Sequence, residues 1–289
     1  MQKTQTAVLK HHIEDGILWL TKNNPQENFG MSRAMLKAMS EALHSISDHP
    51  DIRAVVVDAG GRGFHSGAVA VTELQPRLED LGRDDFQRLV KLGHTLGSQI
   101  AALPIPVIGI ARGGALGGGL ELLLRSDFLY CLDGARFSFP EVTLGFVAAW
   151  GGTQLAARLM PFRRAQEMLL LGESINGIQA AEFGLVTGSF ATPEHLDGHL
   201  SNVLERLRHC SPASVRWTKE CLGAAWEGSF DLGLDRELEA ETETMDSGDF
   251  LKGLGALGNG QVYDYSAGKA VAKKSRLWQR LFVSLTLLK

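Results

Sequence analysis

The chain has 289 residues, a formal net charge of −4, and 44% hydrophobic residues. This length suffices for one large domain or two modest ones with a sizeable buried core. The charge balance gives no electrostatic case for nucleic-acid binding, and no apolar run reaches the ~18–20 residues of a membrane span. The N-terminal residues lack the apolar core of a signal peptide. We therefore expect a soluble, globular, cytoplasmic protein.

The three cysteines, Cys131, Cys210 and Cys221, are odd in number and lack the spacing of a metal site. We interpret them as reduced thiols in a structural role and expect no metal site.

Strand and helix patterns alternate along most of the chain. Residues 6–23 (TAVLKHHIEDGILWLTKN) predict two short strands around an Asp15-Gly16 turn. Apolar residues recur at helical spacing in 31–49 and 84–103, which predicts two helices. Continuous apolar runs in 52–60 and 104–113 predict two buried strands. This alternation implies crossover connections and a largely parallel sheet covered by helices. From about Pro212 onward no strand pattern remains, which predicts a helical C-terminal region.

Two predicted strand ends are rich in glycine, in the segments 55–69 and 107–121. Ligands of such α/β sheets bind beyond the carboxyl ends of the strands, and glycine lets a backbone N–H approach a ligand closely. Neither segment has the spacing of a P-loop or of a dinucleotide-binding fingerprint. The glycines therefore indicate either an N–H site for a developing negative charge or close packing of helix on strand.

Two glutamates stand in apolar surroundings near these segments. Glu121 lies in the first turn of a predicted helix, and Glu141 follows Pro140 in residues 137–145 (FSFPEVTLG). A carboxyl group among apolar residues has a raised pKa, which suits proton transfer. The alternative is structural, with Glu121 as a partner of the helix dipole and Glu141 as a helix N-terminal carboxylate.

Four segments in order, 64–74 (FHSGAVAVTEL), 105–128, 135–160 and 170–186, carry a family resemblance. Over roughly residues 5–255 the chain resembles the enoyl-CoA hydratase/isomerase (crotonase) superfamily. The resemblance implies an α/β fold, a crotonase-like spiral of ββα units followed by a helical trimerisation region. It also implies an acyl-CoA thioester substrate, with coenzyme A entering as part of the substrate and no bound cofactor.

Residue by residue, the resemblance implies the following site. The N–H groups of Ser66 and Gly118 form the oxyanion hole, and Glu121 and Glu141 match the two glutamates of the family's hydratases. The expected substrate-binding residues are Gly67, Ala68, Val69 and Trp150.

Three residues near this site leave alternatives open. Val69 stands where the family usually has an aspartate near the CoA path. Trp150 replaces a small residue, and either limits the acyl pocket or packs against the core. His65, beside Ser66, is either a third candidate base or a loop residue.

The chain is expected to divide into a catalytic core at 1–205, an oligomerisation region at 206–257, and a linker with a basic amphipathic tail at 258–289. The resemblance implies a homotrimer or a dimer of trimers. The tail is expected to pack on a neighbouring subunit, with contact to a membrane surface or a carrier protein as the alternative.

Two carboxylates that share one water can add it across a conjugated double bond by general acid–base catalysis. We therefore predict an enoyl-CoA hydratase. The alternatives are an isomerase, a decarboxylase or another divergent activity of the superfamily, and a binding protein without catalysis.

Overall fold

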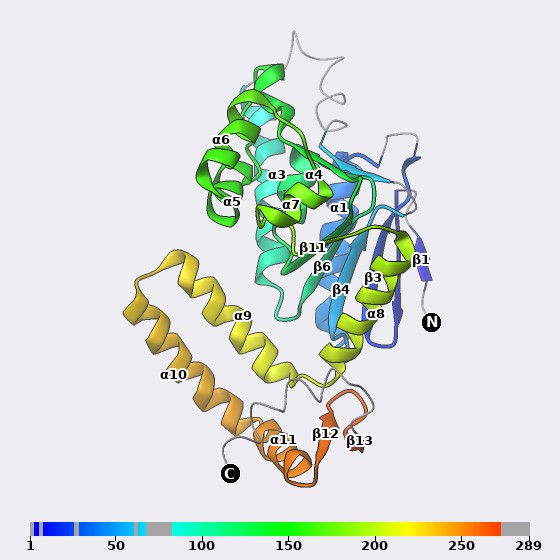
Figure 1. Ribbon diagram of the computed structural model, residues 1–289, viewed down its shortest axis with the longest axis vertical. Helices are drawn as coiled ribbons and strands as arrows, with labels where there is room; N and C mark the ends of the chain where they lie inside the picture. Colours follow the sequence, from blue (N-terminus) through cyan, green and yellow to red (C-terminus); the bar gives the residue numbers. More distant parts are fainter. Residues whose placement is uncertain (1–2, 6–7, 26–28, 61–62, 68–82, 273–289) are drawn as a thin grey trace. The chain divides into compact units, whose positions relative to one another are not determined.

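The computed structural model describes residues 3–5, 8–25, 29–60, 63–67 and 83–272 (Figure 1). Ala68, Val69 and residues 273–289 of the predicted tail lie outside these ranges. The chain divides into two compact units, Met1–Ser201 and Asn202–Lys289. The division between catalytic core, oligomerisation region and tail remains a prediction.

The first unit contains two sheets. In the described part of the chain, the larger sheet has seven strands in the order β1-β2-β3-β4-β6-β8-β11. Strands β1 to β3 pair antiparallel and β3 to β11 pair parallel. The strands are β1 (Lys3–Gln5), β2 (Leu9–Glu14), β3 (Ile17–Lys22), β4 (Ala54–Asp58), β6 (Val107–Ala111), β8 (Phe128–Leu132) and β11 (Gly188–Phe190). The predicted hairpin around Asp15-Gly16 is confirmed, since β2 and β3 pair across that turn.

The smaller sheet has the order β10-β9-β7-β5 among the described residues. Its strands are β5 (Phe64–Ser66), β7 (Gly114–Leu116), β9 (Arg136–Ser138) and β10 (Ile175–Asn176). Each of β4, β6 and β8 in the large sheet is followed by β5, β7 or β9 in the small sheet. Helix α3 (Arg83–Ala102) follows β5, and helix α4 (Gly118–Leu123) follows β7. The predicted α/β fold of repeated ββα units is confirmed.

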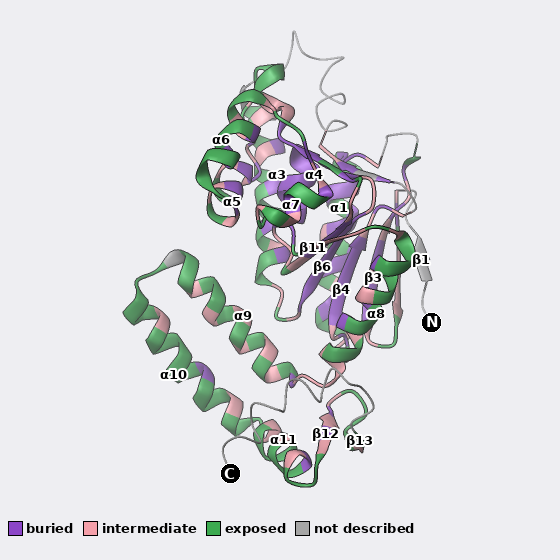
Figure 2. Ribbon diagram, in the orientation of Figure 1, coloured by how far each residue is buried: buried purple, intermediate pink, exposed green. Residues whose placement is uncertain are grey.

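Helices cover the sheets and enclose one apolar core. Strand β6 is buried along its length and β4 is buried except for its last residue, Asp58, as Figure 2 shows. Helix α1 (Arg33–His44) begins at Ser32, whose hydroxyl accepts a hydrogen bond from the N–H of Met35, and it packs against α3. The described part of this unit also contains the helical elements η2 (Ser45–Asp48), η4 (Pro140–Leu144), α5 (Gly152–Leu159), α6 (Phe162–Leu171), α7 (Gly177–Glu182) and the start of α8 (Pro193–Arg208).

The second unit is mainly helical, as predicted, with α9 (Pro212–Glu227), α10 (Phe230–Asp246) and α11 (Asp249–Gly258). Its α9 and α10 pack against each other. The expected absence of strands after Pro212 is wrong, because β12 (Gln261–Asp264) and β13 (Lys269–Ala272) form an antiparallel hairpin. Ser266 and Ala267 donate their N–H groups to Asp264 Oδ1, and Gly268 has a positive φ of 65°, which together close the turn. None of the helices in the described ranges has the length and apolar character needed to cross a bilayer.

Candidate active site

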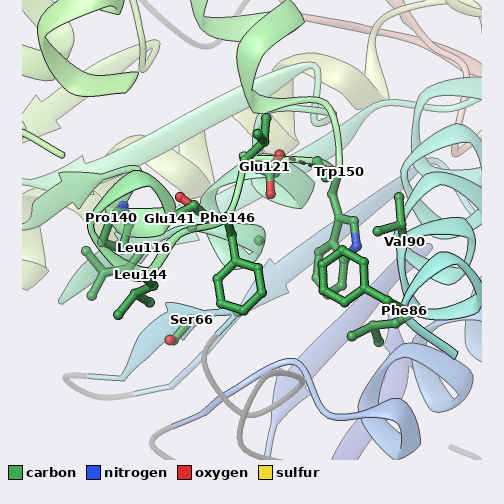
Figure 3. Close-up of a pocket in the computed structure, with 16 residues that line it drawn as sticks. Ser66, Phe86, Val90, Leu116, Glu121, Pro140, Glu141, Leu144, Phe146 and Trp150 are labelled. Carbon is green, nitrogen blue, oxygen red and sulfur yellow. Dashed lines mark hydrogen bonds between the residues drawn. The ribbon is translucent and has the colours of Figure 1, made fainter. Parts of the chain in front are cut away.

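A pocket of about 170 Å³ lies where the short strands of the small sheet end (Figure 3). The end of β5, the β7–α4 junction, the η4 segment, the loop before α5 and the N-terminal half of α3 form its walls. The lining is mostly apolar, with Glu121 and Glu141 as its carboxylates among the described residues. The structure therefore brings together the two glutamates and both glycine-rich segments singled out in the sequence.

The glycines allow three backbone segments to approach one another. A Cβ on Gly67 would lie 2.6 Å from the nitrogen of Gly118, and one on Gly119 would lie 2.2 Å from the carbonyl oxygen of His65. Such distances are too short for any side chain, so glycine is required for this approach. The predicted role of the glycines in close packing is therefore confirmed, and this packing places the first N–H of α4 at the pocket. Their role as an N–H site for a developing negative charge stays a prediction.

Glu121 occupies the first turn of α4, as predicted, and is 2% exposed. Its Oε1 accepts two backbone hydrogen bonds, each 2.7 Å long, from the N–H groups of Trp150 and Gly152. Burial raises the pKa of Glu121 to about 7; the N–H of Gly152 opposes this rise and the charge of Glu141 adds to it. The side chain is therefore held in place while its proton affinity is suited to proton transfer near neutral pH.

Glu141 lies in the first turn of η4, directly after Pro140. Its Oε2 is buried and accepts no hydrogen bond from any described residue, and burial raises the pKa of this carboxyl group. A Cβ on Gly117 would lie 2.4 Å from Glu141 Oε1, so the carboxyl group rests against the bare backbone of Gly117. An unpartnered buried carboxyl oxygen at a pocket is costly unless a ligand or water supplies the missing donor.

The two predicted oxyanion donors differ in their surroundings. Gly118 lines the pocket and is the first residue of α4, so its N–H has no partner within the helix. Ser66 also lines the pocket, but its backbone forms a parallel β-bridge with Gly30, and its carbonyl accepts from the N–H of Met31. Gly67 likewise donates its N–H to the carbonyl of Leu116 at 3.2 Å. The N–H of Gly118 is therefore a candidate donor to a ligand in the pocket, and donation by the N–H of Ser66 stays a prediction.

Trp150 is 6% exposed and both packs and lines the pocket. A Cβ on Gly93 or on Gly118 would lie 2.3 Å or 2.5 Å from its ring. The indole is therefore wedged between α3 and the start of α4. The two interpretations of Trp150 left open by the sequence are compatible, because the ring that packs between the helices also forms a wall of the pocket.

His65 is not placed as a base of this pocket. It is 1% exposed, its Nε2 hydrogen-bonds the carbonyl of Ile110 at 2.9 Å, and burial holds its pKa well below the ordinary value. It lies instead beside Lys22, at a separate cavity of about 10 Å³. The candidate base in the sequence is thus a buried histidine that ties β5 to β6.

Sequence reasoning missed the aromatic wall of the pocket. The rings of Phe86 and Phe146 stack with centroids 5.7 Å apart and an interplanar angle of 10°. Both side chains line the pocket, together with Leu89 and Val90 of α3. The amphipathic pattern of α3 was recognised, but it does not indicate that the first turns of the helix face a ligand site.

Comparisons with known proteins agree with this geometry. A family model described as enoyl-CoA hydratase/isomerase matches residues 12–260. The 2,3-dehydroadipyl-CoA hydratase of Escherichia coli is 30% identical over 240 residues, covering 83% of this chain and 91% of the relative. The peroxisomal Δ(3,5)-Δ(2,4)-dienoyl-CoA isomerase of Arabidopsis thaliana is 27% identical over 235 residues, covering 79% and 84%.

Solved structures similar to this chain also include enoyl-CoA hydratases and a hydratase/isomerase. The structure of an enoyl-CoA hydratase/isomerase from Marinobacter aquaeolei has a TM-score of 0.82 and 25% identity, covering 90% of this chain and 100% of that one. The enoyl-CoA hydratase of Bacillus anthracis has a TM-score of 0.79 and 26% identity, covering 92% and 99%. Relatives of similar identity therefore include both hydratases and isomerases.

Proposed function

Because this chain belongs to the enoyl-CoA hydratase/isomerase (crotonase) family, we propose that it is an acyl-CoA enzyme that adds water across the α,β double bond of an enoyl-CoA thioester. The observation that carries the proposal is the pair Glu121 and Glu141 in one pocket beside the N–H of Gly118. Coenzyme A enters as part of the substrate, and the reaction needs no bound cofactor.

The thioester carbonyl oxygen accepts a hydrogen bond from the N–H of Gly118, which stabilises the enolate that forms when water adds. A water molecule held between the two carboxyl groups supplies the hydroxyl group that is added. Its oxygen bonds to the β-carbon, one of its protons passes to a carboxylate, and a carboxyl group delivers a proton to the α-carbon. The product is a 3-hydroxyacyl-CoA, and the proton count of the pair is restored.

The unequal surroundings of the carboxyl groups support shared proton transfer. Glu121 Oε1 accepts from two backbone N–H groups, yet burial and the charge of Glu141 still raise the pKa of Glu121 to about 7. Glu141 Oε2 is buried without such a donor, and burial raises the pKa of Glu141 as well. Carboxyl groups in such different environments favour one ionised and one protonated member, which general acid–base catalysis requires.

The test is the product formed in D2O from short, medium and aromatic enoyl-CoA thioesters, measured by mass spectrometry. Hydration adds one heavy water to the substrate and supports the proposal. Deuterium exchange at the α- or γ-carbon without addition of water would replace hydration with isomerisation. Unchanged thioesters throughout would contradict both activities.

We also propose that the second unit mediates self-association into trimers, as the family resemblance implied. The support is the number of large apolar side chains that α9, α10 and α11 expose, which is unusual for a free surface. They are Leu222, Trp226, Phe230, Leu238, Leu251 and Leu254. Sedimentation equilibrium checks this proposal, and a monomer at micromolar concentration would contradict it.

A further inference from the structure

Two neighbouring residues of α3 contact the segment Ala149–Trp150, which precedes α5. Gly93 receives the indole ring of Trp150, and His94 Nε2 lies 2.6 Å from the carbonyl oxygen of Ala149. A carbonyl oxygen only accepts hydrogen bonds, so Nε2 carries the hydrogen and His94 is the donor. His94 is exposed and does not belong to the pocket lining.

The carbonyl of Ala149 and the N–H of Trp150 belong to the same peptide group. That N–H donates to Glu121 Oε1 at 2.7 Å. A peptide group is planar and nearly rigid, so a bond that holds its C=O also fixes the direction of its N–H. Hydrogen bonds in series polarise one another, which strengthens the bond that reaches the carboxylate.

We propose that His94 is a positioning residue for Glu121, acting through the peptide group between Ala149 and Trp150. Its catalytic consequence rests on the proposed function, in which Glu121 transfers a proton. The second hydrogen bond to Oε1, from Gly152, does not involve this peptide. Loss of the His94 hydrogen bond therefore weakens the bond from the N–H of Trp150 to Glu121, while the bond from Gly152 keeps the carboxyl group in place.

Other charged groups also act on this part of the site. Glu141 of η4 raises the pKa of Glu121, and Arg125, after α4, lies against Gly151, where a Cβ would be 2.6 Å from its Nη2. Neither group is altered by a substitution at His94. A change in the proton affinity of Glu121 after such a substitution is therefore assigned to the peptide group.

The test compares His94→Ala, His94→Gln and the control Lys91→Ala, an exposed position on the same helix. We expect His94→Ala to raise the apparent pKa of Glu121 by roughly half a pH unit, because a weaker N–H bond stabilises the carboxylate less. The rate constant kcat should fall several-fold with KM nearly unchanged. His94→Gln should restore both values, since its side-chain amide can also donate to Ala149, and Lys91→Ala should match the wild type.

Two measurements distinguish a failure of the positioning role from a failure of the proposed function. One is the pH profile of kcat/KM, and the other is the carboxyl infrared band of Glu121 against pH, identified by its loss in Glu121→Gln. An unchanged pKa in His94→Ala, or a change that His94→Gln does not reverse, would overturn the positioning role even if hydration is found. A shifted infrared titration in an enzyme without hydratase activity would support the positioning role while the proposed function fails.

Discussion

Helix α4 separates two pairs of titratable side chains that differ in the space beside them. Glu121 and Glu141 line a pocket of about 170 Å³, whereas Lys22 and His65 line a cavity of about 10 Å³. Roughly 150 Å³ of apolar space admits a benzene ring, whereas roughly 10–15 Å³ holds one water at most. The first pair therefore has room for a substrate and the second has none.

Both pairs have shifted pKa values, so the shifts alone do not identify the active site. Burial lowers the pKa of Lys22 to about 7, a larger change than the rise of Glu121 to about 7. Lys22 Nζ donates a hydrogen bond to the carbonyl of Phe29 at 2.9 Å, so this lysine has a structural role in holding the backbone at Phe29. A shifted pKa reports burial, and only access to a ligand converts it into a candidate catalytic group.

The largest effect should come from removing either carboxylate of the pocket. Glu121→Gln and Glu141→Gln should each lower kcat by about 10²–10⁴-fold, because an amide neither takes up nor delivers the proton. Thioester binding, measured by calorimetry, should remain near the wild-type value. Glu182→Gln, on the exposed surface of α7, is the control. A Glu141→Gln enzyme that binds the thioester and keeps full activity would refute the two-carboxylate mechanism.

Moving a carboxylate without changing it should have a smaller effect. Gly117→Ala places a methyl group 2.4 Å from the position of Glu141 Oε1, at a residue with a φ of 52°. The carboxyl group must shift, and a misplacement of this size should reduce kcat by about 10–100-fold. Steady-state kinetics check this, with Gly198→Ala as the control because a Cβ there meets nothing within 4 Å. Equal rates for the two variants would show that Gly117 does not set the position of Glu141.

Across α4, Lys22→Met should change stability and leave activity within about twofold. The pKa of Lys22 falls from 10.5 to about 7 on folding, so the unfolded state binds the proton more tightly than the folded state does. Burial of Lys22 therefore lowers the free energy of unfolding by an amount that grows as the pH drops from 10.5 to 7 and is constant below pH 7. The substitution should therefore stabilise the fold by about 2 kcal/mol at pH 6.5, with a smaller gain at pH 9. Urea unfolding at both pH values measures this gain. A tenfold loss of activity without loss of structure would make Lys22 part of the site.

The smallest effect concerns substrate size. Trp150→Phe keeps the backbone N–H that Glu121 accepts but shortens the ring between Gly93 and Gly118. The ratio of kcat/KM for an eight-carbon to a four-carbon enoyl-CoA should rise roughly threefold to tenfold. Trp226→Phe, in the second unit, is the matched control. An unchanged ratio would leave Trp150 with a packing role alone.

Local patterns in the sequence predicted the main elements around this site. The apolar spacing of Met35, Leu36, Met39 and Leu43 marked the buried face of α1, and Glu121 was expected in the first turn of a helix. The meeting of Glu121 and Glu141 came from family resemblance, because no local pattern brings β7 and β9 side by side. The hairpin at 261–272 was missed although its turn residues were visible, since its glycine-rich start looked like a linker.

Other features depend on contacts between distant residues. The stacking of Phe86 on Phe146, the seat of Trp150 on Gly93 and the bond from His94 to Ala149 each join segments more than 50 residues apart. The burial of His65 depends likewise on the pairing of β5 within the small sheet and on the carbonyl of Ile110. Periodicity and motif spacing describe neighbours along the chain, so such contacts require the folded structure.

The most direct test compares, in one assay, a variant of the pair Glu121 and Glu141 with a variant of the pair Lys22 and His65. Wild type, Glu141→Gln and Lys22→Met are incubated with the same enoyl-CoA in D2O, and the product is identified by mass spectrometry. We predict a 3-hydroxyacyl-CoA carrying deuterium at the α-carbon from wild type and Lys22→Met, and almost none from Glu141→Gln. Water addition by Glu141→Gln at the wild-type rate would contradict it.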